Sequence, residues 1–518
     1  MHHYDVLPYE SNPFRETHPQ FLAALGRLFG VPAADPARCR VLELGCASGG
    51  NLIPMAWHLP HSEFVGIDLE AAQIREGQEL VAELGLGNIH LAQGDILQLD
   101  DELGRFDYII AHGVYSWVPA PVQEALMALC RRLLQPQGIA YISFNTRPGW
   151  HVRGMLREML LYHVRGVEEP VARLNKAYEL IELLSSTLPQ QSRPLAKHLA
   201  MEVSYLKKAH PSYVYHEYLE TYNAPVLVSE FLAQVERHGL RFLCESELYT
   251  MFASSLGPQV EQFLDQFPDQ ASHEQYLDLL TQRTFRQTLL CQGEVAPNYN
   301  IDLERLDQFA CYANLQPPEK LDLRHDRPQS FHTAAGNTVE VAEPLCKAML
   351  KILFEVFPDA VALTELLPAA RELVRAAHGK KPAPAETVAW RGELFNLVAN
   401  CLLNLCLEPM ALRTGIDTRP RLNALAQAQV RRGISNLTTV WHETLNTDAF
   451  SHHLARLLDG TRDRQALLDQ LMQNVADGSL SLPDLPAGVQ QRRTSLAANL
   501  DRMLVLFARN GILEGSPS

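Results

Sequence analysis

The feature that most constrains the fold is a regular alternation of short apolar runs and helical patterns that begins near residue 40. Strands that alternate with helices at this spacing form a parallel sheet covered by helices on both faces. Glycine and proline end several of the helical patterns, as expected at helix boundaries. The expected strands are 40–45, 63–68, 88–95, 106–113 and 138–145, and the expected helices are 21–30, 51–60, 69–87 and 121–138.

The alternation is interrupted and then resumes. Residues 151–225 are mostly helical in pattern and are interpreted as an insertion, either a substrate lid or a dimerisation surface. A helix at 228–239, a sixth strand at 240–248 and a seventh at 285–294 then complete the sheet. The sequence therefore predicts an α/β, Rossmann-like seven-stranded domain built from residues 1–150 and 226–294.

Residues 295–518 do not continue the alternation of strands and helices. One set of short helices, which includes 344–358 and 392–408, ends in an apolar strand-like segment at 410–415. A second set ends in a similar segment at 511–515. The segment 324–337 is interpreted as a linker with a loop-like start. We expect two mainly helical, winged-helix-like domains at 295–418 and 419–518, because 518 residues exceed what one core usually supports.

A glycine-rich turn follows the first strand, in VLELGCASGGNL (41–52). Its order does not match the G-x-G-x-x-G of dinucleotide-binding proteins, and it lacks the lysine of a phosphate-binding loop. Glu43 lies just before the turn. A carboxylate in this position suits a ligand with a positive amino or sulfonium group better than a diphosphate.

Two further acids end the next two strands. Asp68 can accept hydrogen bonds from ribose hydroxyls, and Asp95 can accept one from an adenine amino group. The carboxyl ends of neighbouring parallel strands meet at one edge of a sheet, which is where such sheets bind ligands. The three acids are therefore expected to line one adenosyl site.

The motifs VLELGCASGG, VGIDLE and QGDI resemble those of class I S-adenosylmethionine-dependent methyltransferases. The resemblance implies S-adenosylmethionine as the cofactor. It places Glu43 near the methionine moiety, Asp68 on the ribose and Asp95 on the adenine. The full set of cofactor-binding residues that we expect is Glu43, Gly45, Cys46, Ala47, Gly49, Asn51, Asp68, Leu69, Asp95, Ile96 and His112.

A closer resemblance covers most of the chain and is sharpest in residues 1–150. The segments PYESNPFRETHP, HGVYSWVP, FNTRPGW, HEYLE and RTFRQTLLC are similar to those of bacterial methyltransferases with a methyltransferase regulatory domain. This group includes the rickettsial-type protein-lysine methyltransferases. The resemblance does not specify the substrate.

Candidates for the transfer step follow the fourth and fifth strands. Methyl transfer from a sulfonium is an in-line displacement, and an amine acceptor must be neutral to attack. Tyr115 and Trp117 are candidates for the walls of the methyl channel, His112 for a base or cofactor contact, and Asn145 for an acceptor from a substrate amine. Aromatic packing, a structural hydrogen bond and turn capping are the respective alternatives.

Two more candidates lie outside the sheet. Tyr9 belongs to an N-terminal segment that in the similar family often covers the cofactor. Glu217, next to His216, offers a carboxylate for a cationic substrate. The alternative is that the run YVYHEYLETY (213–222) is an amphipathic helix packed by its tyrosines.

Composition narrows the class of partner. A formal net charge of −15 disfavours nucleic acid, and no apolar run has the length of a membrane span. We see no secretory signal, and nine scattered cysteines without a CxxC pair favour reduced thiols and a cytoplasmic protein. His452 and His453 are adjacent, which does not suit a shared metal, so no metal is expected.

These observations favour a methyltransferase that acts on a protein, with lysine preferred, because a small-molecule enzyme seldom needs such a long C-terminal portion. One alternative is a methyltransferase of a small molecule or pathway intermediate. Another is a non-catalytic, cofactor-binding regulatory protein. A homodimer is compatible with each.

Overall fold

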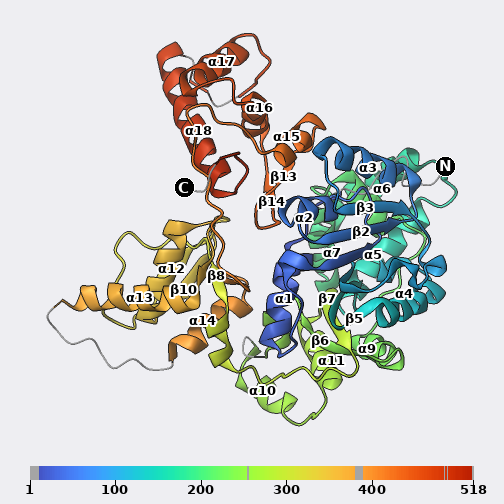
Figure 1. The fold of residues 1–518 in the computed structure, drawn as a ribbon. Helices are drawn as coiled ribbons and strands as arrows, with labels where there is room; N and C mark the ends of the chain where they lie inside the picture. The colour runs from blue at the N-terminus through green and yellow to red at the C-terminus, as the bar shows by residue number, and fades with distance from the viewer. Residues whose placement is uncertain (1–10, 254–255, 380–388, 483–484, 487, 516–518) are drawn as a thin grey trace.

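A computed structural model describes residues 11–253, 256–379, 389–482, 485–486 and 488–515 of the 518-residue chain. A domain with a large sheet comes first in the chain, coloured blue to green in Figure 1. A middle unit and a C-terminal helical unit follow it, in yellow to orange and in orange to red (Figure 1). No helix among the described residues is both long enough and apolar enough to cross a membrane.

The large sheet has seven strands in the order β3-β2-β1-β4-β5-β7-β6. Strands β1 to β5 pair in parallel, and β7 is antiparallel to both β5 and β6. The predicted seven-stranded, Rossmann-like sheet is confirmed. Its strands are β1 Arg40–Leu44, β2 Glu63–Asp68, β3 Ile89–Gln93, β4 Phe106–Ala111, β5 Leu134–Asn145, β6 Leu240–Glu245 and β7 Phe285–Gln292.

Helices cover both faces of this sheet because successive side chains of each strand point to opposite sides. Val41 and Ile110 belong to one buried cluster, which includes residues of three helices. Leu42 and Ile109 belong to a second cluster, which includes residues of two other helices. The helices of the first face are α1 Pro19–Leu28, α2 Leu52–His58 and α3 Ala71–Leu84, and those of the second are α4 Ala120–Leu133 and α9 Val228–Arg237.

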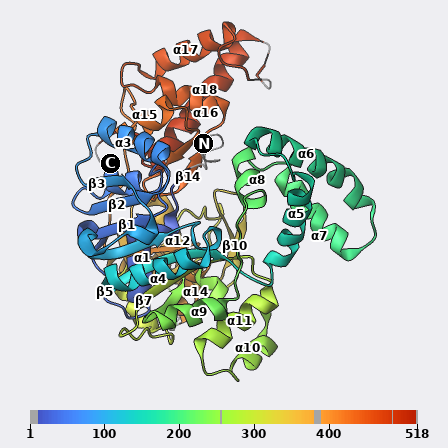
Figure 2. The same ribbon diagram turned by 90° about the vertical axis from the view of Figure 1, so that its right-hand side faces the viewer.

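The chain leaves the sheet after β5 to form a helical insertion with a core of its own. In Figure 2 this insertion is the separate lobe at the right. It returns at Val226, whose N–H donates to the carbonyl of Asn145 at 3.1 Å. Its helices are α5 Trp150–His163, α6 Pro170–Thr187, α7 Pro194–Leu206 and α8 Pro211–Tyr218, and α10 Pro258–Leu264 and α11 Gln270–Thr281 lie between β6 and β7.

The middle unit combines three helices with two small sheets, of order β11-β8-β12 and β10-β9. Its elements are β8 Ala310–Tyr312, β9 Gln329–His332, β10 Thr338–Val341, α12 Pro344–Val356, β11 Val361–Ala362, α13 Leu363–His378, α14 Ala389–Ala399 and β12 Asn404–Cys406.

One local expectation in this unit was wrong, namely the helix expected at 392–408. That helix ends at Ala399, and Leu405 lies in β12, where it pairs with Cys311 on β8. A short apolar run suits a buried strand as well as a helix, so its pattern alone does not decide between them.

Two further segments differ in part from what the pattern indicated. The linker expected at 324–337 has the expected loop-like start and then contains β9, which pairs with β10 across a turn at Gly336, whose φ of 84° is the left-handed conformation that glycine favours. The segment 410–415, expected to be strand-like, forms isolated bridges at Met410, which pairs with Ala360, and at Thr414, and no longer strand. In both places, pairing with another segment decided the structure, and the local pattern did not contain that information.

The C-terminal unit has a separate hydrophobic core. Near its end, the segment expected to be strand-like at 511–515 forms an isolated bridge between Leu513 and Leu422. Ion pairs from Arg431 and Arg432 to Glu83 on α3 join this unit to the sheet domain. Its elements are α15 Ala424–Arg431, β13 Asn436–Thr438, β14 Thr444–Asn446, α16 Ala449–Leu457, α17 Arg464–Ala476 and α18 Val489–Arg509.

Candidate functional site

The glycine-rich turn connects β1 to α2 at the carboxyl edge of the sheet. Gly45 and Gly49 both have a φ of 77°, a conformation that other residues rarely adopt. A Cβ atom on Gly45 would also lie 2.6 Å from Cγ2 of Val114, which is too close. Ala47, with a φ of 50°, donates its backbone N–H to Oδ2 of Asp68 at 2.8 Å. The turn, with Cys46 buried inside it, is therefore held against the end of β2.

Glu43 is a buried carboxylate with one hydrogen bond. Its Oε1 accepts from Nδ2 of Asn51 at 2.8 Å, while its buried Oε2 has no partner among the residues that the structure describes. Burial raises the pKa of Glu43 to about 7; the hydrogen bond from Asn51 opposes this rise and the charge of Asp68 adds to it. A buried polar atom without a partner is costly, and a cationic ligand group would supply the missing donor. These residues therefore fit a cofactor that carries an ammonium group.

The other two acids lie at the ends of the neighbouring strands. Asp68 closes β2, and its Oδ1 accepts from the N–H of Glu70 at 2.9 Å. Asp95 follows β3 and caps the short 3₁₀ helix Ile96–Gln98 by accepting from the N–H of Leu97 at 3.0 Å. Each carboxylate oxygen can accept more than one hydrogen bond, so these contacts leave room for a ligand. Leu69, beside Asp68, is 56% exposed.

His112 follows β4 and lies among aromatic rings. Its Nδ1 is 2.9 Å from the hydroxyl of Tyr141, and its ring stacks on Phe14 with the centroids 3.9 Å apart. Phe285 approaches the same imidazole edge-on. Burial lowers the pKa of His112 to about 4, so the ring is neutral at pH 7.

Asn145 is the last residue of β5 and is buried. Its backbone N–H donates to Oγ of Ser116 at 2.8 Å, which joins the end of β5 to the 3₁₀ helix that follows β4. Its side-chain Nδ2 is buried and has no partner in the described part of the chain. The structure therefore places a second unsatisfied polar group at this edge of the sheet.

Tyr115 and Trp117 belong to the 3₁₀ helix Tyr115–Trp117, but their surroundings differ. Tyr115 is buried in the core, where its hydroxyl donates to Oε1 of Gln234 at 2.5 Å and its ring contacts Phe231. These are the contacts of a packing residue. Trp117 is half-buried.

Two of the predicted candidates come from outside the sheet. Tyr9 lies outside the described residues. Glu217 lies on α8 in the insertion, where burial raises its pKa to about 7 and the charges of Arg153, His216 and Arg157 oppose the rise. These three residues belong to the same insertion.

Three residues that surround Asn51 were not among the predicted site residues. Its Oδ1 accepts from the backbone N–H of Phe14 at 2.9 Å and lies 2.8 Å from Nε2 of His442, and its Nδ2 also donates to Oγ1 of Thr17 at 3.0 Å. His442 is 391 positions further along the chain, so no local signal could have identified it.

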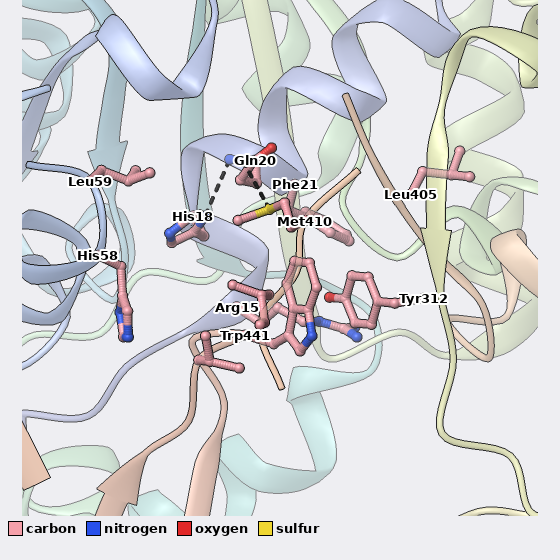
Figure 3. A pocket seen from close by; sticks show the side chains of 12 residues that line it. Arg15, His18, Gln20, Phe21, His58, Leu59, Tyr312, Leu405, Met410 and Trp441 are labelled. Carbon is pink, nitrogen blue, oxygen red and sulfur yellow. Dashed lines mark hydrogen bonds between the residues drawn. The ribbon is translucent and has the colours of Figure 1, made fainter. Parts of the chain in front are cut away.

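A mainly apolar cavity lies next to this group, where the N-terminal segment meets the other two units. Figure 3 shows His18, Arg15, Tyr312 and Trp441 around it. Among the residues that the structure describes, none of the predicted site residues lines this cavity. The same part of the chain contains no group of three or more His, Cys, Asp or Glu side chains placed to hold a metal ion.

Comparison with known proteins identifies three regions. Residues 41–138 match the family described as "Methyltransferase domain", residues 210–292 match "Predicted methyltransferase regulatory domain", and residues 418–512 match "PKMT, C-terminal winged helix domain". The three matched regions follow one another along the chain and include the glycine turn, β6 and β7, and the C-terminal unit. The winged-helix character predicted for the C-terminal unit is confirmed.

Two relatives match nearly the whole chain. The uncharacterized protein RP789 of Rickettsia prowazekii is 31% identical over 98% of this chain and 93% of its own length. The structure of PKMT2 from Rickettsia typhi in complex with AdoHcy has a TM-score of 0.86 and 26% identity, and the match covers 98% of this chain and 100% of that one. The chain belongs to the family of class I S-adenosylmethionine-dependent methyltransferases with a methyltransferase regulatory domain, and it resembles the rickettsial protein-lysine methyltransferases.

Proposed function

We propose that this methyltransferase transfers the methyl group of S-adenosylmethionine to a protein side chain, with lysine favoured. The observation that carries the proposal is the full-length similarity to PKMT2, which extends to the C-terminal winged-helix region as well as the sheet. A small acceptor seldom requires such additional units.

For the cofactor, we propose that Glu43 receives the ammonium group of the methionine moiety. No residue in the described part of the chain pairs with its buried Oε2, which supports this role. Asp68 and Leu69 would hold the ribose, and Asp95 and Ile96 the adenine, as the positions of these residues after β2 and β3 suggest. The remaining cofactor contacts would come from the glycine-rich turn and from the residue that follows β4. These residues are Gly45, Cys46, Ala47, Gly49, Asn51 and His112.

The bound cofactor supplies an electrophilic methyl group on its sulfonium. The protein then has to orient a neutral amine and exclude water. We propose that the side-chain oxygen of Asn145 accepts a hydrogen bond from that amine. A lysine amine has a pKa of about 10.4 in water, and desolvation lowers it.

His112 and Trp117 complete the proposed acceptor site. Because the imidazole of His112 is neutral at pH 7, it does not repel a cationic lysine. Trp117 would present an aromatic face to the cation. The roles of Tyr115, Tyr9 and Glu217 stay predictions, and the core contacts of Tyr115 favour a packing role for it.

The test is to incubate the purified full-length chain and methyl-labelled S-adenosylmethionine with a bacterial lysate. We expect label in protein bands, and methyllysine after hydrolysis of those bands. The matched control is Asp68→Ala, which should lose the labelling because it lacks the proposed ribose contact. Label confined to the small-molecule fraction would overturn the protein substrate, and label on another amino acid would overturn lysine.

A further inference from the structure

The hairpin loop between β13 and β14, residues 439–443, contacts three separate parts of the chain. We call it the wing loop. The rings of Trp441 and Tyr312 lie side by side (Figure 3). They stack with their centroids 3.6 Å apart, and Trp441 donates its indole N–H to the carbonyl of Pro358 at 2.9 Å. Glu443 lies 3.3 Å from Arg15, and His442 lies 2.8 Å from Asn51. The C-terminal unit is therefore joined through this loop to both the middle unit and the sheet domain.

The direction of the hydrogen bond between His442 and Asn51 follows from the surroundings of the ring. His442 is 1% exposed, and none of the described residues hydrogen-bonds to its buried Nδ1. Its Nε2 faces the side-chain oxygen of Asn51, which can only accept. The neutral ring therefore carries its proton on Nε2 and donates it to Asn51. Burial and the nearby histidines His18 and His58 lower the pKa of His442 well below its usual value, which keeps the ring neutral.

The backbone of His442 supports this placement. Its φ is 59°, in the left-handed region that residues other than glycine seldom adopt. Its N–H donates to the carbonyl of Thr439 at 3.0 Å, which closes the wing loop. The loop thus accepts an uncommon conformation at the residue whose side chain reaches Asn51.

The donors around Asn51 fix the orientation of its amide. Oδ1 accepts from Phe14 and His442, so Nδ2 is directed to Oε1 of Glu43 at 2.8 Å. If the amide were reversed, two N–H donors would face its NH₂ group and its oxygen would face the carboxyl group of Glu43. The N–H of His442 therefore favours the orientation in which Asn51 donates to Glu43.

We propose that His442 is a positioning residue for S-adenosylmethionine: it orients Asn51, which holds Glu43 so that Oε2 can receive the cofactor's ammonium group. The proposal rests on the role proposed above for Glu43. It makes the C-terminal unit a part of the cofactor site, although none of its residues was among the predicted cofactor contacts.

The first test compares two substitutions in the full-length chain by calorimetric titration with S-adenosylmethionine. His442→Leu removes the donor, whereas His442→Gln keeps a terminal N–H that can reach Asn51. We expect His442→Leu to raise the Kd about tenfold, the effect expected for one buried hydrogen bond. His442→Gln should stay within about threefold of the unsubstituted chain. Equal losses in both variants, or no loss in His442→Leu, would overturn the proposal.

A double-substitution cycle tests whether His442 acts through Glu43. Glu43→Gln removes the proposed charge contact, so adding His442→Leu should cause little further loss of affinity. If the two effects multiply fully, His442 acts independently of Glu43 and the proposal fails. If Glu43→Gln leaves the Kd unchanged, the proposed role of Glu43 itself fails. If only His442→Leu is without effect, that role stands and this inference alone is wrong.

The matched control lies at the same interface. Arg431→Ala and Arg432→Ala remove ion pairs to Glu83 without altering the contacts of Asn51. The Kd of each variant for S-adenosylmethionine should equal that of the unsubstituted chain. A tenfold rise would show that affinity depends on docking of the C-terminal unit in general and not on the hydrogen bond from His442. If thermal unfolding shows that His442→Leu is not folded, His442→Phe replaces it, because Phe retains a ring but has no donor.

Discussion

At the residue scale, Glu43 is unusual because it is buried, accepts one hydrogen bond and has one oxygen that no described residue contacts as a hydrogen-bond donor. Most buried polar groups are paired, and exceptions are frequent where a ligand binds. Its raised pKa has the same origin, since burial penalises the charged form. A ligand ammonium group would favour the ionised carboxylate.

This leads to a prediction about pH. The free protein holds a proton on Glu43 below about pH 7, and that proton must leave before the carboxylate can pair with an ammonium group. Affinity for S-adenosylmethionine should therefore fall as the pH drops below 7, by up to about tenfold per pH unit, and level off above it. Calorimetric titrations between about pH 5.5 and 8 measure this slope. Glu43→Gln should bind weakly with little pH dependence, and a Kd independent of pH in the unsubstituted chain would contradict the prediction.

The position of a site residue can be predicted from the sequence where the neighbouring residues alone determine it. Glu43, Asp68 and Asp95 could be placed at the ends of successive strands because an acid accompanies an apolar run in each case. Asn145 could be placed at the end of β5 for a similar reason. The partners of Asn51 could not be predicted, because a hydrogen bond between distant residues leaves no periodic pattern in either segment.

At the scale of elements, a buried charge cluster ties α11 to the β6–β7 pair. Arg286 on β7 donates to Glu245 on β6 at 2.6 Å and to Asp278 on α11 at 2.9 Å, and it also pairs with Glu274. All four side chains are buried. Such a cluster is stable only while its charges and hydrogen bonds are matched.

Removing the arginine should therefore be costly. We expect Arg286→Met to lower the free energy of unfolding by about 3–5 kcal/mol, because the carboxylates are left buried without their main cation. Chemical denaturation followed by circular dichroism measures the change. Arg241→Met, an exposed arginine on β6, is the matched control and should stay within about 0.5 kcal/mol. A similar loss in both variants would contradict this account.

The helices and strands also show which sequence patterns are sufficient to predict an element. Strands flanked by turns and covered by helices were located, because burial on both faces gives a continuous apolar run. The start of β5 was misplaced: the helix expected at 121–138 ends at Leu133, and β5 begins at Leu134. The segment after Ala399 was not, because Leu403 and Leu405 are buried in a structure that is partly strand. There the choice between helix and strand depends on pairing with β8.

At the scale of the whole molecule, the wing loop connects units that have separate cores. The C-terminal unit packs around its own hydrophobic cluster, and Trp441 lies instead in a cluster with Tyr312 and Phe357 of the middle unit. The sequence could indicate helical units after the sheet, but it could not indicate how they dock, since docking depends on surfaces that form only after folding.

Trp441 provides a test of this docking. Trp441→Ala removes the stacking with Tyr312 and the hydrogen bond to Pro358, and we expect it to weaken docking by about 3 kcal/mol. In scanning calorimetry the C-terminal unit should then unfold in a separate transition at lower temperature. Val505→Ala, at a half-exposed position on α18, is the control and should leave the profile unchanged. An unaltered single transition in Trp441→Ala would contradict the prediction.

The contact between Asn51 and His442 spans 391 positions, and this has a consequence for synthesis on the ribosome. The sheet can begin to assemble while translation is still in progress, yet Asn51 receives its donor only after the wing loop has emerged from the exit tunnel. Prematurely terminated products would thus carry a glycine turn whose neighbouring amide lacks this donor, so that full activity would be reserved for chains translated through the winged-helix region.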